Sequence, residues 1–328
     1  MAKLINFKDS IFRIASRNSF EQTAIGLCNI QLEQNEVYGA YAEALGIKKV
    51  EHFHEIPFLP IRFFKQYEVK TGTFNAEKIY SSSGTTGSTT SKHFVKQQEI
   101  YIQSYLNAFK KFYGKPQDYF FAALLPSYLE REGSSLIDMC KGLIDLSADK
   151  DSGFFLNEFQ ELYHLLKAKK TAGKKIFLIG VTFGLLDFSE QFSLDLSGAV
   201  VMETGGMKGR RKEMIRAEVH HRLKEAFNVS TIHSEYGMTE LLSQGYSKGN
   251  GLFNTPPWMD VQIRSVSDPF TRVKSGKTGG INVIDLANIH SCAFIETQDL
   301  GRKHPNALFE VMGRFDDSDI RGCNLMVI

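Results

Sequence analysis

The sequence predicts an α/β protein, with a mostly parallel sheet covered by helices and a smaller β-rich part after it. Between residues 76 and 240, short runs of β-formers alternate with segments whose apolar residues recur every three or four positions. Such alternation is typical of a parallel sheet with helices on both faces. After residue 250 the segments are short and β-rich, with Gly, Pro and Asp between them. That change favours a β subdomain resembling a small distorted barrel.

Each predicted element rests on a run or a stripe of residues. The strands are predicted at 119–125 (YFFAALL), 174–180 (KKIFLIG), 198–204 (GAVVMET) and 228–233 (NVSTIH). Three helices are predicted from apolar stripes that each share one helix face. The stripes are Tyr101, Tyr105, Phe109 and Phe112, then Phe159, Leu162, Tyr163 and Leu166, then Ile215, Val219, Leu223 and Phe227. Each stripe is most simply part of the core.

The chain is expected to have three parts. Residues 1–75 form a helical and irregular segment packed on the core, in which Pro57 and Pro60 prevent a continuing helix. Residues 76–250 form the α/β core, and residues 251–328 form the β-rich subdomain.

Composition narrows the class of protein. The 328 residues are 42% hydrophobic and 23% charged, which excludes disorder, collagen and coiled coil as descriptions of the whole chain. With 39 basic and 37 acidic residues, the net charge of +2 is too near neutral to indicate nucleic-acid binding. The 26 Phe residues would suit a large core or an apolar ligand tunnel. A core is the simpler interpretation.

Cysteine usage and apolar runs predict a cytoplasmic protein. Cys28, Cys140, Cys292 and Cys323 form neither a CxxC pair nor a metal-like group, which favours a reducing compartment. The first residues mix charges with apolar residues, unlike a signal peptide. No uncharged apolar run reaches the roughly 18 residues that a transmembrane helix needs.

The stretch from Tyr80 to Lys92 (YSSSGTTGSTTSK) predicts a phosphate-binding loop. It is expected between a β-run ending at Tyr80 and a helix beginning near His93. Gly84 and Gly87 would let the backbone approach an anion, and the helix start would add a partial positive charge. A polyphosphate is the natural ligand. A disordered Ser/Thr linker is the alternative interpretation.

Three further motifs suit a nucleotide. In Glu235–Glu240 (EYGMTE), Tyr236 offers an aromatic face for a base, Thr239 a hydroxyl for phosphate, and Glu240 an oxygen ligand for Mg²⁺. Asp299 could accept hydrogen bonds from two ribose hydroxyls, and Arg314 could pair with phosphate or ribose. Taken singly, each of these segments could be an ordinary turn.

In this order, the motifs resemble those of the adenylate-forming superfamily of acyl-CoA synthetases, luciferases and peptide-synthetase adenylation domains. The resemblance covers about residues 76–322 and implies the large-domain fold of that superfamily, with ATP as substrate and Mg²⁺. It implies adenine contacts at Gly205, Gly206 and the Tyr236–Gly237–Met238 segment, and metal and phosphate contacts at Glu240 and Thr239. It further implies a ribose contact at Asp299, a catalytic position at Arg314, and a phosphate loop of Ser82, Ser83, Gly84, Thr85, Thr86 and Gly87.

Two features depart from the superfamily. Its loop usually continues as Gly-x-Pro-Lys, whereas here STTS separates Gly87 from Lys92, the corresponding catalytic candidate. The superfamily also continues beyond its GRxDD motif into a mobile lid domain with a catalytic lysine, whereas this sequence ends at Ile328. The expected fold is therefore the large domain without the lid.

A narrower resemblance is to the LuxE-type acyl-protein synthetases, the fatty-acid-activating subunits of fatty acid reductase. It rests on residues 56–69 (IPFLPIRFFKQYEV), 81–93, 124–136 (LLPSYLEREGSSL) and 313–323 (GRFDDSDIRGC). It implies a carboxylic acid substrate of the fatty acyl type, an acyl reductase partner, and Cys323 as the acyl carrier. An inert thiol is the alternative interpretation of Cys323.

Two other functions stay open at this level. One is an acyl- or aryl-CoA ligase related to phenylacetate-CoA ligase, with coenzyme A as acceptor. The other is a non-catalytic subunit that binds an acyl group or adenylate within a reductase complex. The sequence also leaves open the length and aromaticity of the acid.

Overall fold

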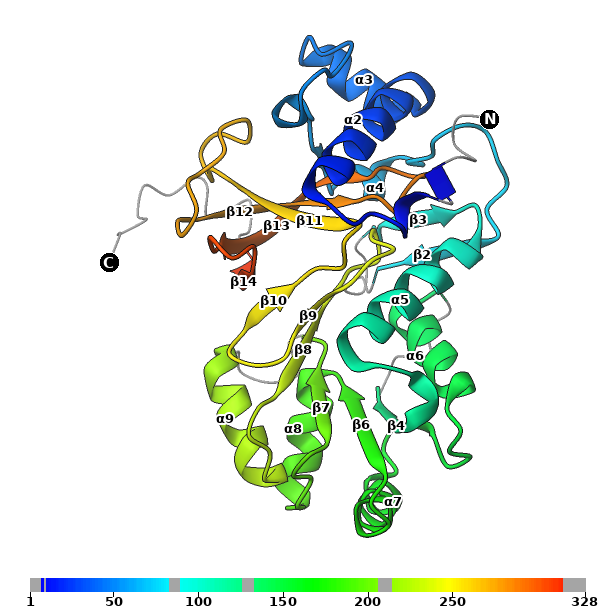
Figure 1. Ribbon diagram of the computed structural model, residues 1–328, viewed down its shortest axis with the longest axis vertical. Coiled ribbons are helices and arrows are strands. Elements are labelled where there is room, and N and C mark those ends of the chain that lie inside the picture. The colour runs from blue at the N-terminus through cyan, green and yellow to red at the C-terminus, as the bar shows by residue number, and fades with distance from the viewer. Residues whose placement is uncertain (1–6, 9, 83–88, 126–132, 206–213, 315–328) are drawn as a thin grey trace. The chain divides into compact units, whose positions relative to one another are not determined.

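The computed structural model describes residues 7–8, 10–82, 89–125, 133–205 and 214–314 (Figure 1). The chain divides into two compact units. Unit 1 contains residues 1–101, 240–243 and 254–328, and unit 2 contains residues 102–239 and 244–253. Unit 1 therefore gathers the predicted N-terminal and β-rich segments, and unit 2 holds most of the predicted α/β core.

Unit 2 is built on the predicted mostly parallel sheet. Its strand order is β10-β9-β8-β7-β6-β4-β5, in which β5, β4, β6, β7 and β8 are parallel and β9 is antiparallel to β8. The prediction of an α/β fold is confirmed. The strands are β4 (Tyr119–Leu124), β5 (Gly153–Phe155), β6 (Lys175–Gly180), β7 (Val200–Glu203), β8 (His233–Tyr236), β9 (Gly245–Ser247) and β10 (Leu252–Asn254).

Helices cover both faces of this sheet because its strands are apolar on both sides. On one face, Phe120 and Leu178 belong to a buried cluster with residues of α7, α8 and α9. On the other face, the rings of Phe121 and Phe177 pack at a tilt against Phe109 of α5, with ring centroids 5.5 and 5.2 Å from it. The helices are α5 (Gln98–Tyr113), α6 (Ser135–Leu146), α7 (Phe159–Thr171), α8 (Thr182–Gln191) and α9 (Arg216–Phe227), and a short turn, η2 (Pro116–Asp118), precedes β4.

Unit 1 is built on the antiparallel strands β11, β12, β13 and β14, which pair in chain order. Strand β1 pairs in parallel with β13, and β2 pairs with β3 in a separate antiparallel ribbon. The strands are β1 (Leu59–Pro60), β2 (Lys78–Ser81), β3 (Lys92–Val95), β11 (Met259–Arg264), β12 (Thr278–Asp285), β13 (Phe294–Lys303) and β14 (Phe309–Arg314). Its helices are α2 (Arg17–Gln34), α3 (Glu36–Ala44), η1 (Phe53–Glu55) and α4 (Phe63–Gln66).

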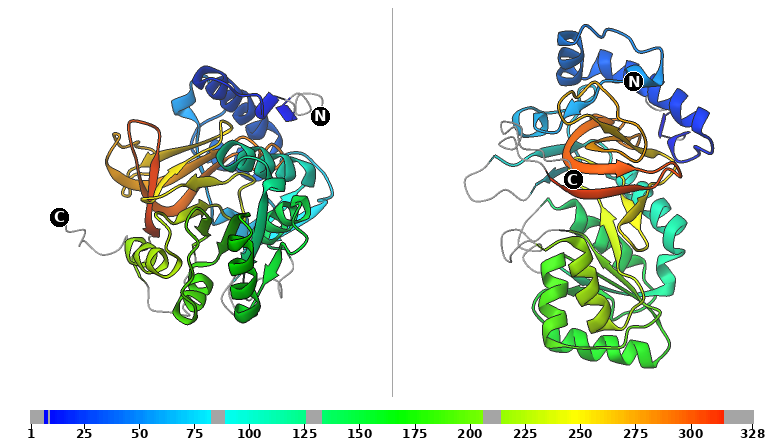
Figure 2. Two further views of the ribbon diagram at one scale, coloured as in Figure 1. Left: turned by 60° about the horizontal axis from the view of Figure 1, so that its bottom comes forward. Right: turned by 90° about the vertical axis from the view of Figure 1, so that its left-hand side faces the viewer.

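Helix α2 lies beside the antiparallel strands of unit 1 (Figure 2), and a buried glutamine attaches it to the loop between β12 and β13. The Gln31 side chain donates to the carbonyl of Asn288 at 2.9 Å and accepts from the amide of Ala293 at 2.9 Å. Gln31 is fully buried, so these bonds satisfy polar groups that water cannot reach. The helix itself begins at Ser16, whose hydroxyl accepts from the Ser19 amide.

Three sequence predictions about local structure are wrong. The loop after Tyr80 leads into β3 and not into a helix, since α5 begins only at Gln98. The predicted strand 228–233 is displaced, because β8 spans His233–Tyr236. Ile215 is not part of the core stripe of α9. It has an extended backbone at the N-cap and is 74% exposed.

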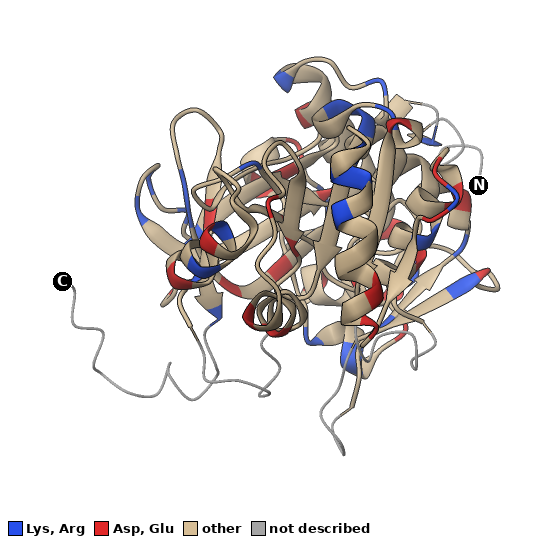
Figure 3. Cartoon of the chain, turned by 90° about the horizontal axis from the view of Figure 1, so that it is seen from below, with Lys and Arg blue, Asp and Glu red and all other residues tan. Residues whose placement is uncertain are grey.

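Acidic and basic residues are mixed along the helices and strands (Figure 3), in agreement with the near-neutral charge. Among the described residues, no helix has both the length and the apolarity that crossing a membrane requires.

Candidate functional site

The two ends of the Ser/Thr-rich loop are joined in unit 1. The Ser91 amide donates to the Ser82 hydroxyl at 2.9 Å, and the Ser82 amide donates to the Ser91 carbonyl at 3.1 Å. Lys92 is exposed on β3, where it pairs with Ser81. The loop therefore connects the two strands of an antiparallel ribbon, and the described residues directly after it form β3 and not the start of a helix. The predicted phosphate contacts Ser83, Gly84, Thr85, Thr86 and Gly87 lie outside the described residues.

Glu240 lies beside the end of this loop. Glu240 is 6% exposed, and burial raises the pKa of its carboxyl group. A hydrogen bond from the Ser91 side chain lowers this pKa, and so do the positive charges of Arg314 and Lys65. Unit 1 thus brings the predicted metal ligand together with the loop end and with Arg314.

Asp285 at the end of β12 holds the segment that carries Glu240. Its Oδ2 accepts from the amides of Leu242 at 2.7 Å and Ser243 at 3.0 Å, and its Oδ1 accepts from the Ser243 hydroxyl at 2.5 Å. Burial raises the pKa of Asp285 to about 6, although these donors and the Ala287 amide lower it. The sequence analysis missed Asp285. A carboxylate in the apolar run INVIDLA was the available signal.

Asp299 and Arg314 form one ion pair. They face each other in the register of β13 and β14, and the Nε of Arg314 lies 2.9 Å from the Oδ1 of Asp299. Asp299 is buried, whereas the Arg314 side chain is 68% exposed. The two residues that the sequence predicted separately for ribose and phosphate therefore form one polar element.

In unit 2, Glu203 anchors the turn at Gly205. Its Oε2 accepts from the Gly205 amide at 2.7 Å and from the Thr182 hydroxyl at 3.0 Å. Its Oε1 lies 3.4 Å from the Nε of Arg216 and 3.5 Å from the Nε2 of His220.

The ionised form of Glu203 is favoured. Burial by itself would raise its pKa, but His220, Arg216, Ser234 and the Gly205 amide together lower it to about 2. Gly205 has a φ of 71°, a conformation that favours glycine. The sequence analysis missed Glu203, although an acid at the end of an apolar strand, directly before TGG, was a signal.

Tyr236 is the last residue of β8, and the three residues after it follow the carboxyl end of that strand. Tyr236 is buried and lies edge-on to the ring of Phe253, with centroids 6.1 Å apart. At Gly237 a side chain would collide with the carboxylate of Glu235. Met238 and Thr239 are partly exposed at this end of the strand. Ligands of parallel sheets bind beyond such strand ends, which is the position expected for the adenine contacts.

Glu235 is a titratable group to which the sequence analysis gave no role. Burial, and then the charge of Glu203, raise the pKa of Glu235 to about 8. It is therefore mostly protonated at neutral pH, and it can donate a hydrogen bond there.

The predicted site residues belong to both units. Ser82, Lys92, Glu240, Asp299 and Arg314 are in unit 1, and the turn and strand end from Gly205 and Tyr236 to Thr239 are in unit 2. Gly206 and Cys323 lie outside the described residues.

For a magnesium ion, the described residues of this site offer few protein ligands. No group of three metal-ligating residues occurs in the part of the chain that the structure describes. Glu240 fits an ion that has one protein carboxylate and otherwise phosphate and water oxygens, which is how Mg²⁺ usually binds with nucleotides.

Comparisons with known proteins support the fold. No protein-family model matches the sequence, and no curated protein matches it. The structure is similar to 2-hydroxyisobutyryl-CoA ligase in complex with 2-HIB-AMP and CoA, with a TM-score of 0.64 and 14% identity over 92% of this chain and 68% of that one. The same ligase in its postadenylation state gives a TM-score of 0.62 at 12% identity, with the same coverage of both chains.

A second solved structure is less similar. Apo MatB from Rhodopseudomonas palustris gives a TM-score of 0.52 and 14% identity over 73% of this chain. This chain spans 48% of the length of MatB. At these identities the likeness shows the fold alone, and the predicted large-domain fold of the adenylate-forming enzymes is confirmed.

Proposed function

We propose that this protein activates a carboxylic acid with ATP and transfers the acyl group to a thiol. In the first step a carboxylate oxygen of the acid attacks the α-phosphorus of ATP. The bond to pyrophosphate breaks, and acyl-adenylate forms. In the second step a thiolate attacks the acyl carbon, the bond to AMP breaks, and a thioester forms. ATP is needed because an oxide is a poor leaving group, whereas AMP is a good one.

The arrangement in unit 1 is the observation that carries this proposal. Glu240 lies at the end of the Ser/Thr-rich loop, and Arg314 is paired with Asp299 nearby in the same unit. In phosphoryl transfer, catalysis is mainly positioning and charge neutralisation. Glu240 would hold Mg²⁺, which when bound neutralises the phosphate charge. Asp299 would accept from the ribose, and Lys92 is a further candidate for contact with the leaving group.

Cys323 is the proposed acceptor thiol, as in the LuxE-type acyl-protein synthetases. The other cysteines, Cys28, Cys140 and Cys292, are buried, and burial raises the pKa of each. For Cys28, burial raises the pKa to about 12. Since the thiolate is the nucleophile, these three are poor acceptors.

Intact-mass measurement tests the self-acylating function. The protein is incubated with Mg-ATP and a panel of aliphatic and aromatic acids, and an acyl adduct that hydroxylamine removes is expected. Cys323→Ser should lack the adduct, while the control Cys28→Ala should retain it. An adduct on Cys323→Ser would refute Cys323 as acceptor. Addition of an acyl reductase and NADPH to the adduct would test for a reductase partner.

A coenzyme A ligase is the second candidate function, because the similar ligase was solved with CoA in its thioesterification state. In that case, coenzyme A should be consumed, and Cys323→Ser should keep full activity. ATP–pyrophosphate exchange is expected under both functions. Its absence with every acid would favour a non-catalytic subunit instead.

A further inference from the structure

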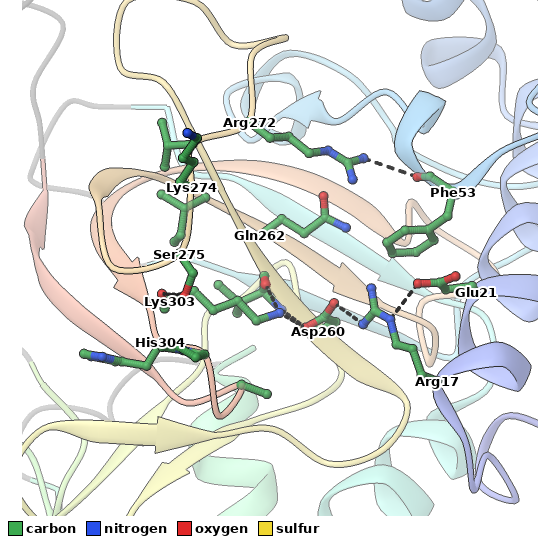
Figure 4. A pocket seen from close by; sticks show the side chains of 15 residues that line it. Arg17, Glu21, Phe53, Asp260, Gln262, Arg272, Lys274, Ser275, Lys303 and His304 are labelled. Carbon is green, nitrogen blue, oxygen red and sulfur yellow. Dashed lines mark hydrogen bonds and ion pairs between the residues drawn. The ribbon is translucent and has the colours of Figure 1, made fainter.

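Unit 1 contains a cavity of about 500 Å³ that includes none of the site residues described above (Figure 4). It lies between β11, the first turns of α2, η1, the segment 272–275 and the hairpin after β13. The polar side chains of Asp260 and Gln262 share one face of β11, because successive side chains of a strand alternate. Its volume is in the range of pockets that bind small molecules.

The acidic groups of the cavity are already paired. Asp260 Oδ2 lies 2.7 Å from Arg17 Nη1, and Asp260 Oδ1 lies 2.5 Å from Lys303 Nζ. Glu21 Oε1 lies 2.7 Å from Arg17 Nε. Figure 4 shows these contacts on one side of the cavity. The two carboxylates are therefore occupied by Arg17 and Lys303.

Two further cations of the cavity, Arg272 and Lys274, have no carboxylate partner among the described residues. Arg272 donates only to backbone carbonyls, those of Phe53 at 3.2 Å and His54 at 3.0 Å. Burial, and then the positive charge of Arg17, lower the pKa of Arg272, although the charges of Asp260 and Glu21 act in the opposite direction. An anion in the cavity would relieve this repulsion.

Gln262 provides an independent sign of a ligand. It is 8% exposed, and in the described part of the chain its Oε1 has no hydrogen-bond partner. In Figure 4 its side chain lies between Arg272 and the Asp260–Lys303 pair, and no interaction reaches it. A buried acceptor without a donor is costly, so a hydroxyl of a ligand would stabilise it.

We propose that this cavity binds a small phosphomonoester that carries hydroxyl groups. The phosphate lies against Arg272 and Lys274, and a ligand hydroxyl donates to the carbonyl of Gln262. The ligand class follows from the cavity, which presents unpaired cations and an unpaired acceptor side by side. The site is separate from the proposed ATP site and does not depend on the adenylation proposal.

Isothermal titration of the full chain tests the site, with glucose 6-phosphate as the probe and glucose and inorganic phosphate as comparisons. Glucose 6-phosphate should bind saturably, phosphate should bind more weakly and compete, and glucose should not bind. Lys274→Ala and Gln262→Met should each weaken binding about tenfold, the loss of one good polar contact. Lys277→Ala, an exposed control on the same loop, and Glu240→Gln at the proposed ATP site should leave the affinity unchanged.

A second measurement covers the folding of the variants. Gln262→Met removes a buried unpaired carbonyl while keeping its volume, so without ligand it should unfold at the same or a higher temperature than the wild type. With glucose 6-phosphate the wild type should gain more stability than the variant. Absence of saturable binding to the wild type would overturn the proposal. Equal affinity in Lys274→Ala and Lys277→Ala, or loss of binding only in Glu240→Gln, would also overturn it.

Discussion

Replacement of Glu203 by Gln tests whether an ionised, buried carboxylate holds the turn at Gly205. In the wild type this carboxylate accepts from Gly205 and Thr182 and lies beside Arg216 and His220. Gln keeps the shape and one acceptor, but it removes the charge and turns an NH₂ group toward other donors. The variant should therefore lose stability in unit 2.

The magnitude follows from the pKa of about 2. An ordinary Glu has a pKa of about 4.3, so the ionised form is favoured in the folded state by about two units, or roughly 3 kcal/mol. Because the folded-state pKa is lowered, this stability is present above about pH 4.5 and disappears as the pH falls toward 2. At pH 3 about half of it should remain.

Urea unfolding followed by circular dichroism, together with hydrogen exchange of peptides 198–205 and 214–227, measures the loss. At pH 7 Glu203→Gln should speed exchange in both peptides by about 100-fold. The matched control is Glu218→Gln on α9, whose carboxylate pairs at 2.8 Å with Arg222 on the surface. That pair should contribute less than about 1 kcal/mol.

Two results would refute the reasoning about Glu203. One is an equal loss in the Glu203 and Glu218 variants at pH 7. The other is a difference between them that does not shrink from pH 7 to pH 3, since an effect that ignores pH cannot come from the ionised carboxylate.

Three further predictions concern unit 1. Asp285→Asn should lower the free energy of unfolding by about 2–3 kcal/mol, because its new NH₂ group must face either the Leu242 and Ser243 amides or the Ala287 amide. Since burial raises the pKa of Asp285 to about 6, the wild type should lose stability as the pH rises from about 4 to 6, and urea midpoints of the variant should lack this slope. Asp299→Asn should raise the KM for ATP in pyrophosphate exchange about tenfold, because the ribose loses one carboxylate acceptor. Equal KM values would contradict the ribose role. Gln31→Leu should lower the urea midpoint by leaving the Asn288 carbonyl and Ala293 amide unpaired, and an unchanged midpoint would show that water replaces the amide.

Local sequence patterns were sufficient to predict several elements of the α/β core. The apolar runs at 119–125 and 174–180 are strands, and the stripe from Tyr101 to Phe112 lies on one helix. These predictions hold because the side-chain periods of helices and strands are local properties of the backbone. The order of Ser/Thr loop, EYGMTE, Asp299 and Arg314 was likewise readable, and it indicated the superfamily whose fold the structure has.

The pairing of Lys92 and the roles of Glu203 and Asp285 depend on partners that are distant along the chain, and the sequence alone did not predict them. Nothing near Lys92 indicates that it pairs with Ser81 in a ribbon instead of beginning a helix, because strand pairing depends on both strands. Glu203 and Asp285 each read as one acid in an apolar run. Their roles arise only when the fold places Thr182 and Arg216, or the Leu242 and Ser243 amides, against them in a buried region. Burial is a property of tertiary structure, and it gives these carboxylates opposite pKa shifts according to the charges and donors that surround them.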